Sequence, residues 1–171
     1  MDVQYRSRQV IEKAHEKIDA FIKNGSEVAR PLQRELRNIM WEYCGVVRSE
    51  DKLQNGLMKI NKLKESLKNL DVRPGSEGFE DLMLAFDLEG SIMSAEATIL
   101  GGIARKESRG AHQRSDFTET SIAYDANFKI KLQDNDTLKV TKEKLKPLSK
   151  ELDAIVNSTK EIEDFKGMLL E

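Results

Sequence analysis

Apolar residues recur every three or four positions through the first hundred residues, which is the spacing of one face of an α-helix. The pattern is strongest after Ser49, where a capping hydroxyl and two acids precede leucines and isoleucines that continue to Leu70. Turn-forming residues interrupt it at Asn24-Gly25-Ser26 and at Arg73-Pro74-Gly75-Ser76. The pattern therefore predicts four helices, at about residues 3–23, 28–47, 49–70 and 77–105.

The same spacing predicts which face of each helix is buried. In the first helix, the predicted inner residues are Val10, Ala14, Ile18 and Phe21. The second helix is predicted to bury Val46 or Val47 near its end. In the fourth, the predicted inner residues are Phe79, Leu82, Met83, Phe86, Met93, Ala97, Leu100 and Ile103.

The pattern changes from helical spacing to alternation in the last third of the chain. Phe128, Ile130 and Leu132 alternate with lysines, a turn-rich triplet follows at residues 134–136, and alternation resumes at residues 138–140. This pattern predicts a β-hairpin, which must pack on the bundle or on another surface because two strands alone are marginally stable. The residues from Pro147 onward predict a helix or a fraying tail.

The predicted fold is mainly α: an up-and-down antiparallel bundle of three to four helices, similar to a spectrin repeat, with a small C-terminal β-hairpin. Three segments are predicted. They are a helical bundle at residues 1–117, a hairpin extension at 118–147 and a C-terminal helix or tail at 148–171.

The composition argues against several classes of partner and site. The net charge of the 171-residue chain is −2, so no basic field points to nucleic acid. The apolar runs are too short for direct membrane insertion, and the N-terminus lacks the apolar core of a signal peptide. Cys44 is the single cysteine, and no Cys/His cluster has metal-ligand spacing. A cytoplasmic protein without a metal site is expected.

Candidate chemistry is concentrated in the sequence RKESRGAHQRSDF, residues 105–117. It holds four cationic residues, two acids, Ser108 and His112, and Gly110 predicts a helix C-cap and a turn. Three interpretations compete: a solvated helix end, a cluster of ion pairs that fixes the helix end, and a catalytic site with His112 as base. Ser108 and His112 could meet only if the helix continued past Gly110.

Two motifs resemble one family. The first is residues 105–117, with the spelling Arg-x-Glu-Ser-Arg-Gly-Ala-His-x-Arg-x-Asp-Phe. The second is carried by Met40, Trp41, Gly45, Val46, Arg48 and Leu53. Together they resemble the C-terminal helical domain of the flavoprotein subunits of succinate dehydrogenase and fumarate reductase. The family commonly has proline after the Asp-Phe pair, whereas this chain has Thr118.

The resemblance implies a structural domain of a larger flavoprotein. In the family, FAD and the dicarboxylate bind to an FAD-binding domain and a capping domain, and this chain has no Gly-x-Gly-x-x-Gly turn. No catalytic, cofactor-binding or metal-binding residue is therefore assigned here. The expected partners are those two domains and the iron–sulfur subunit, in the cytoplasm or peripherally at the inner face of the cell membrane. Adenylylsulfate reductase and L-aspartate oxidase have similar domains, but the Glu-Ser-Arg-Gly-Ala-His spelling favours the succinate/fumarate branch.

The residues expected at the interface are Arg105, Glu107, Ser108, Arg109, Gly110, His112, Arg114, Asp116 and Phe117. Their charges are expected to be exposed in the isolated bundle, because burying charges of both signs is costly. On this basis, Arg109→Ala would barely change the melting temperature of the chain but would weaken its assembly with an FAD-binding partner. The alternative function is a stand-alone module that binds an acidic partner or anion through Arg105, Arg109, His112 and Arg114. A small hydrolase that uses Ser108 and His112 is a third possibility.

Overall fold

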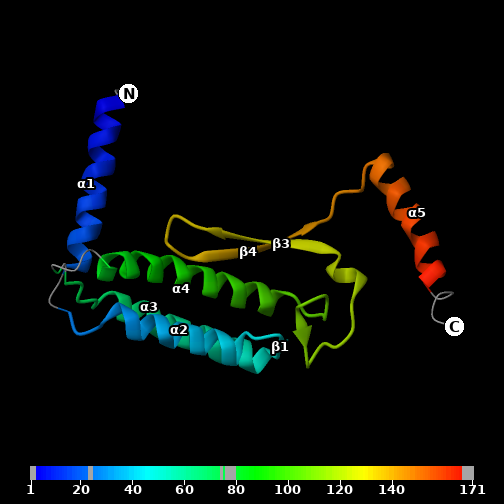
Figure 1. Cartoon of the computed structure of the whole chain (residues 1–171), viewed down its shortest axis with the longest axis horizontal. Helices are drawn as coiled ribbons and strands as arrows, with labels where there is room; N and C mark the ends of the chain where they lie inside the picture. Colours follow the sequence, from blue (N-terminus) through cyan, green and yellow to red (C-terminus); the bar gives the residue numbers. More distant parts are fainter. Residues whose placement is uncertain (1–2, 23–24, 74, 76–79, 167–171) are drawn as a thin grey trace.

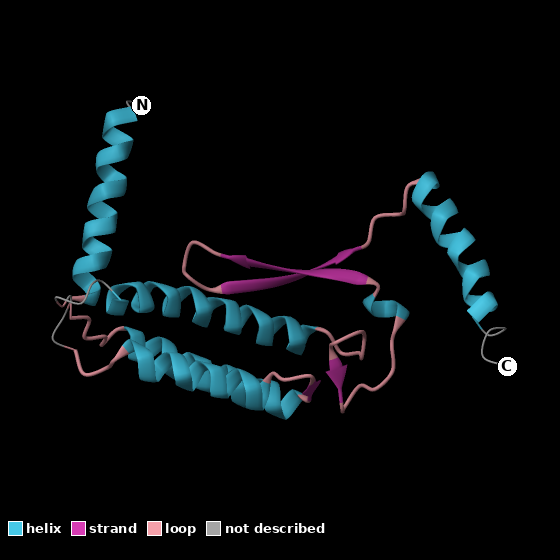
Figure 2. Cartoon of the chain, in the orientation of Figure 1, coloured by secondary structure: helices cyan, strands magenta, loops and turns pink. Residues whose placement is uncertain are grey.

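The computed structural model describes residues 3–22, 25–73, 75 and 80–166, without the side chains of residues 3–5 and 159–166. Its elements, in chain order, are α1 (Val3–Phe21), α2 (Ala29–Tyr43), β1 (Val47–Arg48), α3 (Glu50–Leu67), α4 (Glu80–Ala104), β2 (Gln113–Arg114), the 3-10 helix η1 (Ile122–Tyr124), β3 (Ala126–Leu132), β4 (Leu138–Lys144) and α5 (Lys150–Lys166). Figures 1 and 2 show α2, α3 and α4 side by side, with the hairpin of β3 and β4 above them. The mainly helical fold with a small antiparallel hairpin is confirmed.

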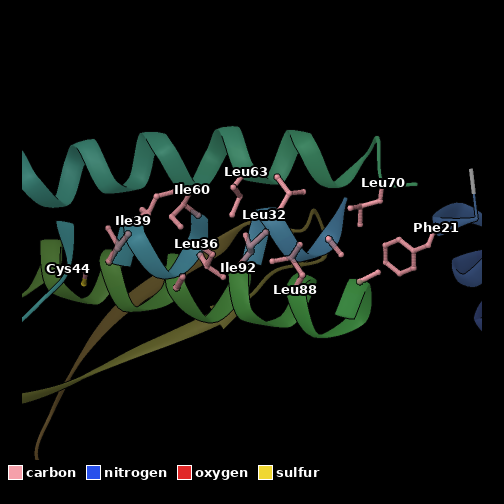
Figure 3. Close-up of a cluster of buried hydrophobic side chains, with 14 of the residues drawn as sticks. Phe21, Leu32, Leu36, Ile39, Cys44, Ile60, Leu63, Leu70, Leu88 and Ile92 are labelled. Carbon is pink, nitrogen blue, oxygen red and sulfur yellow. The ribbon is translucent and has the colours of Figure 1, made fainter. Parts of the chain in front are cut away.

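The hydrophobic core lies between α2, α3 and α4. Figure 3 shows Leu32, Leu36 and Ile39 of α2 among the buried side chains of the other two helices. The predicted start of α3 is confirmed, because the Ser49 hydroxyl accepts a hydrogen bond from the backbone N–H of Lys52 at 3.3 Å. Cys44 also lies in this core. Burial of these apolar side chains is the main stabilising contribution.

The buried face of α4 differs from the prediction. Met83, Phe86 and Met93 are exposed, whereas the buried apolar residues are Ala85, Leu88, Ile92, Ala95 and Ile99. Phe79 lies outside the described residues. Helix α4 carries apolar residues on nearly all sides because it packs against α2 and α3 on one side and against the hairpin on another. Periodicity alone could not select the core face.

The apolar stripe predicted for the first helix is also not buried along its length. Phe21 is buried, and its ring packs edge-on against Phe86 at a centroid distance of 5.1 Å. Val10, however, is 67% exposed, and α1 projects from one end of the bundle (Figure 1). Helix α2 ends at Tyr43, earlier than predicted, so that Val46 and Val47 are exposed. Amphipathic spacing identifies a face but does not identify what covers it.

The hairpin packs on the bundle as expected. Strands β3 and β4 pair antiparallel from Ala126 opposite Lys144 to Leu132 opposite Leu138. The side chain of Ile130 reaches Gly101 of α4, where a Cβ would lie 3.4 Å from the Ile130 Cδ1 atom. The hairpin therefore gains the apolar surface that an isolated strand pair lacks.

Two helical glycines give a matched test of this packing. An alanine Cβ at Gly56 of α3 would lie 2.8 Å from the Tyr43 Cβ and 3.3 Å from the Ile99 Cδ1. A Cβ at Gly90 of α4 would meet nothing within 4 Å. We expect Gly56→Ala to lower the free energy of unfolding by about 1–3 kcal/mol and Gly90→Ala to raise it by about 0.5–1 kcal/mol. Urea denaturation of both variants measures this, and equal effects would contradict the close α2–α3–α4 contact.

Candidate functional site

Residues 105–117, which we call the signature loop, connect the end of α4 to the segment that leads into the hairpin. Helix α4 ends at Ala104, so Gly110 is not its C-cap as predicted. Gly110 instead occupies a tight turn, with a φ of 57°, in which Arg109 and His112 exchange backbone hydrogen bonds of 2.8 and 3.1 Å. A positive φ favours glycine at this position. The predicted turn is therefore present, six residues beyond the helix end.

The signature loop is attached to the connection between α2 and α3. Strand β2 pairs in parallel with β1, so that Arg114 lies opposite Arg48. The backbone N–H of Ser115 donates to the Arg48 carbonyl at 2.8 Å, and its hydroxyl donates to the same oxygen at 3.2 Å. This pairing brings the two sequence motifs into contact.

Glu107 is the centre of a first charged cluster, and its side chain is 0% exposed. Arg109 donates to both carboxylate oxygens, at 2.9 and 3.2 Å, while Arg105 donates to Oε1 and the backbone N–H of Ser121 donates to Oε2 at 2.8 Å. The Arg109 hydrogen bonds are the largest cause that lowers the pKa of Glu107, to about 2. Arg109 also pairs with Asp125 at 2.7 Å. The cluster holds the start of the hairpin segment against the end of α4.

Arg114 is the centre of a second cluster and is buried almost completely. Its guanidinium donates twice to Asp116 at 2.7 Å, to Glu50 Oε2 at 3.0 Å and to the Gly102 carbonyl at 2.9 Å. It also lies over the Phe117 ring, 5.0 Å from the centroid. Because Gly102 is in the last turn of α4 and Glu50 begins α3, one side chain joins the ends of two helices.

Asp116 completes this junction. Its Oδ2 atom accepts a hydrogen bond from the backbone N–H of Glu50 at 2.9 Å, so the carboxylate lies at the positive end of the α3 dipole. The hydrogen bonds from Arg114 hold the pKa of Asp116 well below its usual range. Asp116 therefore stabilises α3 from a position 66 residues further along the chain.

Arg105 links the signature loop to the hairpin. Its guanidinium donates to the carbonyls of Tyr124 at 3.1 Å and Ala126 at 2.7 Å, and lies 4.7 Å from the centroid of the Phe128 ring. Ala126 and Phe128 are the first inward-facing residues of β3. The arginine thus aligns the hairpin with the end of α4.

His112 lies between a guanidinium and a carbonyl. Its Nδ1 atom is 2.9 Å from Nη1 of Arg48, and its Nε2 atom is 3.0 Å from the carbonyl oxygen of Arg105. A guanidinium can only donate and a carbonyl can only accept, so the proton resides on Nε2 and the imidazole is neutral. Burial is the largest cause that lowers the pKa of His112, with further contributions from Arg48 and Arg114.

This geometry predicts a pH dependence of stability. The pKa of His112 lies below its ordinary value of 6.5 in the folded chain, so below pH 6.5 the unfolded chain binds more protons. The contribution of His112 is therefore present above pH 6.5 and is lost as the pH falls. We expect the melting temperature to decrease less between about pH 8 and about pH 5.5 for His112→Gln than for the wild type. Parallel curves for the two proteins would contradict the neutral imidazole.

Ser108 does not form a catalytic pair with His112. Its hydroxyl accepts from the backbone N–H of Arg114 at 2.8 Å and donates to the Phe117 carbonyl at 2.8 Å. Both ring nitrogens of His112 have other partners, as described above. A nucleophile needs a positioned base, so the arrangement does not favour the hydrolase interpretation.

The structure brings the predicted site residues together, but it buries part of them. The expectation of exposed charges is wrong for Glu107 and Arg114, and Ser108 is also buried. It holds for Arg109, whose side chain is 42% exposed. Since Arg114 is inaccessible and His112 is neutral, the four residues of the alternative function cannot form one common anion site. The interpretation that the structure supports is the cluster of ion pairs.

Three charged partners of the site were not predicted from the sequence: Arg48, Glu50 and Asp125. Arg48 belongs to the second motif, and Glu50 directly follows the Ser49 cap within it. The available signal was that this motif and the signature loop resemble the same family. Within the described residues, no helix is long and apolar enough to cross a membrane. The described part of the chain also contains no group of three or more His, Cys, Asp or Glu side chains placed to hold a metal ion.

Proteins of known sequence match part of this chain. An uncharacterized FAD-dependent oxidoreductase of Methanocaldococcus jannaschii is 37% identical over 100 residues, covering 58% of this chain and 18% of that protein. One subunit of the fumarate reductase (CoM/CoB) of Methanothermobacter marburgensis is 34% identical over 114 residues, covering 66% of this chain and 21% of that protein. The chain thus spans about a fifth of the length of these relatives.

Solved structures share the fold. Quinol fumarate reductase of Escherichia coli superposes with a TM-score of 0.78 at 23% identity, over 87% of this chain and 26% of that one. Adenylylsulfate reductase of Archaeoglobus fulgidus gives a TM-score of 0.70 at 22% identity, over 82% of this chain and 25% of that one. The family described as fumarate reductase flavoprotein C-term matches residues 33–158, which include both motifs. The resemblance predicted from the motifs is confirmed, and the chain belongs to this family of flavoprotein C-terminal domains.

Proposed function

We propose that this chain acts as the C-terminal domain of an FAD-dependent oxidoreductase that interconverts succinate and fumarate. The observation that carries the proposal is the family match over residues 33–158, with the complete signature loop inside it. FAD and the dicarboxylate would bind to other domains. Adenylylsulfate reductase is a weaker alternative, because the matching family model is that of fumarate reductase flavoproteins and the subunit from Methanothermobacter marburgensis is also named as a fumarate reductase.

The proposed role is structural. The two ion-pair clusters join α3, α4 and the hairpin into one rigid end, which suits a surface that holds other domains in place. Beside the signature loop, Trp41 is 86% exposed, and Val46 and Val47 are also exposed. Exposed apolar groups at a polar rim are typical of interfaces. We therefore propose that this end of the bundle contacts the FAD-binding and capping domains. The iron–sulfur subunit is a further candidate partner for the same surface.

In this proposal the chain itself is not catalytic. The hydroxyl of Ser108 and both nitrogens of His112 are used in structural hydrogen bonds. The helices α2, α3 and α4 would form the up-and-down bundle of the spectrin-repeat type, and the boundaries at residues 117 and 147 stay predictions. The assembly would lie in the cytoplasm or peripherally at the inner face of the cell membrane.

Reconstitution with a flavin-binding partner tests the function. The chain would be purified alone and after co-expression with the FAD-binding domain encoded beside it or fused to it. We expect flavin absorbance and succinate oxidation only in the co-purified complex. Stoichiometric flavin and succinate oxidation in the chain alone would contradict the structural role, and failure of the two proteins to co-purify would contradict the domain assignment.

Arg109→Ala separates stability from assembly. The structure changes the expectation that the sequence alone supports for this variant, because Arg109 donates two hydrogen bonds to the buried Glu107 carboxylate. We expect a measurable decrease in the melting temperature of the chain, in addition to weaker co-purification with the FAD-binding domain. Lys106→Ala, which removes an exposed cation of the same loop, is the control for melting. An unchanged melting temperature for Arg109→Ala would show that the hydrogen bonds from Arg105 and Ser121 are sufficient to stabilise the buried Glu107 carboxylate.

A further inference from the structure

A groove of about 790 Å³ runs between α2 and α4, away from the ion-pair clusters. Leu36 and Met40 line it from α2, and Phe86 lines it from α4. The α4 side also carries Asp87 and several small residues, including Gly90 and Ser94, and a Cβ at Gly90 would meet nothing within 4 Å. Small residues allow the backbone of a second helix to approach closely. The groove therefore suits an amphipathic helix.

One arginine of α2 lines this groove, and two more arginines share its helix stripe. Arg30, Arg34 and Arg37 follow one another at spacings of four and three, which places them on one stripe of α2. Arg30 donates to Glu80 at 2.8 Å, whereas Arg34 and Arg37 have no hydrogen bond or ion pair to another described residue. Arg37 also lines the groove. An occupant with acids beside its apolar face would complement these arginines.

Helix α5 has these properties. Its 17 residues include five acids and three lysines, and Figure 1 shows it standing apart from the bundle. Leu148 and Leu152 are more than half exposed, and Leu152, Ile155 and Val156 follow the spacing of a helical stripe. At 1.5 Å per residue α5 is about 25 Å long, which exceeds the roughly 18 Å of α4 between Phe86 and Thr98. Its length, charge and apolar face all match the groove.

We propose that two copies of this chain associate by reciprocal exchange of α5, each helix lying in the α2–α4 groove of the other copy. The reciprocal arrangement makes the same contact twice, as a two-fold dimer requires. Helix α1 is the other projecting helix, but it carries four cations and three acids and so does not complement the arginines. The association is independent of the proposed function, since no flavin domain takes part in it.

Sedimentation of the 171-residue chain over a range of concentrations tests the proposal. We expect a dimer whose Kd increases at least about tenfold in Arg34→Glu/Arg37→Glu and in Leu152→Asp, because one introduces like charges and the other buries a charge. Adding Glu151→Arg/Asp153→Arg to the arginine variant should restore the dimer. The control Arg8→Glu/Lys13→Glu makes the same change of net charge on exposed positions of α1 and should leave Kd unchanged.

Three results would overturn the proposal. One is a chain that remains monomeric at the highest concentration. Another is a monomer whose melting temperature decreases when α5 is deleted, which would mean that α5 closes onto its own groove. The last is a dimer that neither groove nor α5 variants weaken. Far-ultraviolet circular dichroism of each variant verifies that its helices are intact, so that a loss of dimer is not a loss of fold.

Discussion

Replacing Arg114 with alanine is expected to lower the free energy of unfolding by about 3–5 kcal/mol, the cost of removing one partner from a buried ion pair. The guanidinium is fully buried and bonds to Asp116, Glu50 and the Gly102 carbonyl. Its removal would leave two carboxylates close together and a helix-end carbonyl without its donor. Urea denaturation at neutral pH measures the change.

A conservative substitution of Arg114 and a control at an exposed arginine show how Arg114 acts. Arg114→Lys keeps the charge but loses the planar fork that bonds Asp116 through two nitrogens, so an intermediate loss is expected. Arg8→Ala removes an exposed arginine of α1 and should change stability by less than about 0.5 kcal/mol. If Arg114→Ala cost no more than Arg8→Ala, the junction between α3 and α4 would not depend on this side chain.

The parts of the fold that could be predicted from the sequence are those with a local cause. Helix α3 has both a cap at Ser49 and an uninterrupted apolar stripe, so its start and its buried face were predictable. The turn at Gly110 was predictable because glycine tolerates the positive φ found there. Strands β1 and β2 contain two residues each, which is too short for any periodic pattern, and they were not predicted.

The candidate site needed tertiary information. Its residues were identified from the motif, but the motif could not show that Glu107 and Arg114 are buried, because charged residues are usually exposed. Their burial depends on partners far away in the sequence: Arg114 pairs with Glu50, 64 residues earlier. The fourth helix shows the same limit, since its apolar residues face both the core and the hairpin.

Glu107→Gln is expected to have an effect as large as Arg114→Ala, about 3–5 kcal/mol at neutral pH. Glutamine keeps the size of the side chain but removes the charge that holds Arg105 and Arg109. Its amide group would also place N–H donors against these guanidinium groups, which are themselves donors. Glu12→Gln on the exposed surface of α1 is the matched control, with an expected change below about 0.5 kcal/mol.

The effect of Glu107→Gln should itself depend on pH. The pKa of Glu107 is about 2 in the folded chain and 4.5 ordinarily, so between these values the unfolded chain binds more protons than the folded chain. The stabilisation by the carboxylate is therefore complete above pH 4.5 and is lost as the pH falls through about 2. Urea denaturation at several pH values should show the wild type and Glu107→Gln converging over this range. A difference that stays constant down to about pH 2 would mean that the size and shape of the side chain, and not its charge, hold the signature loop in place.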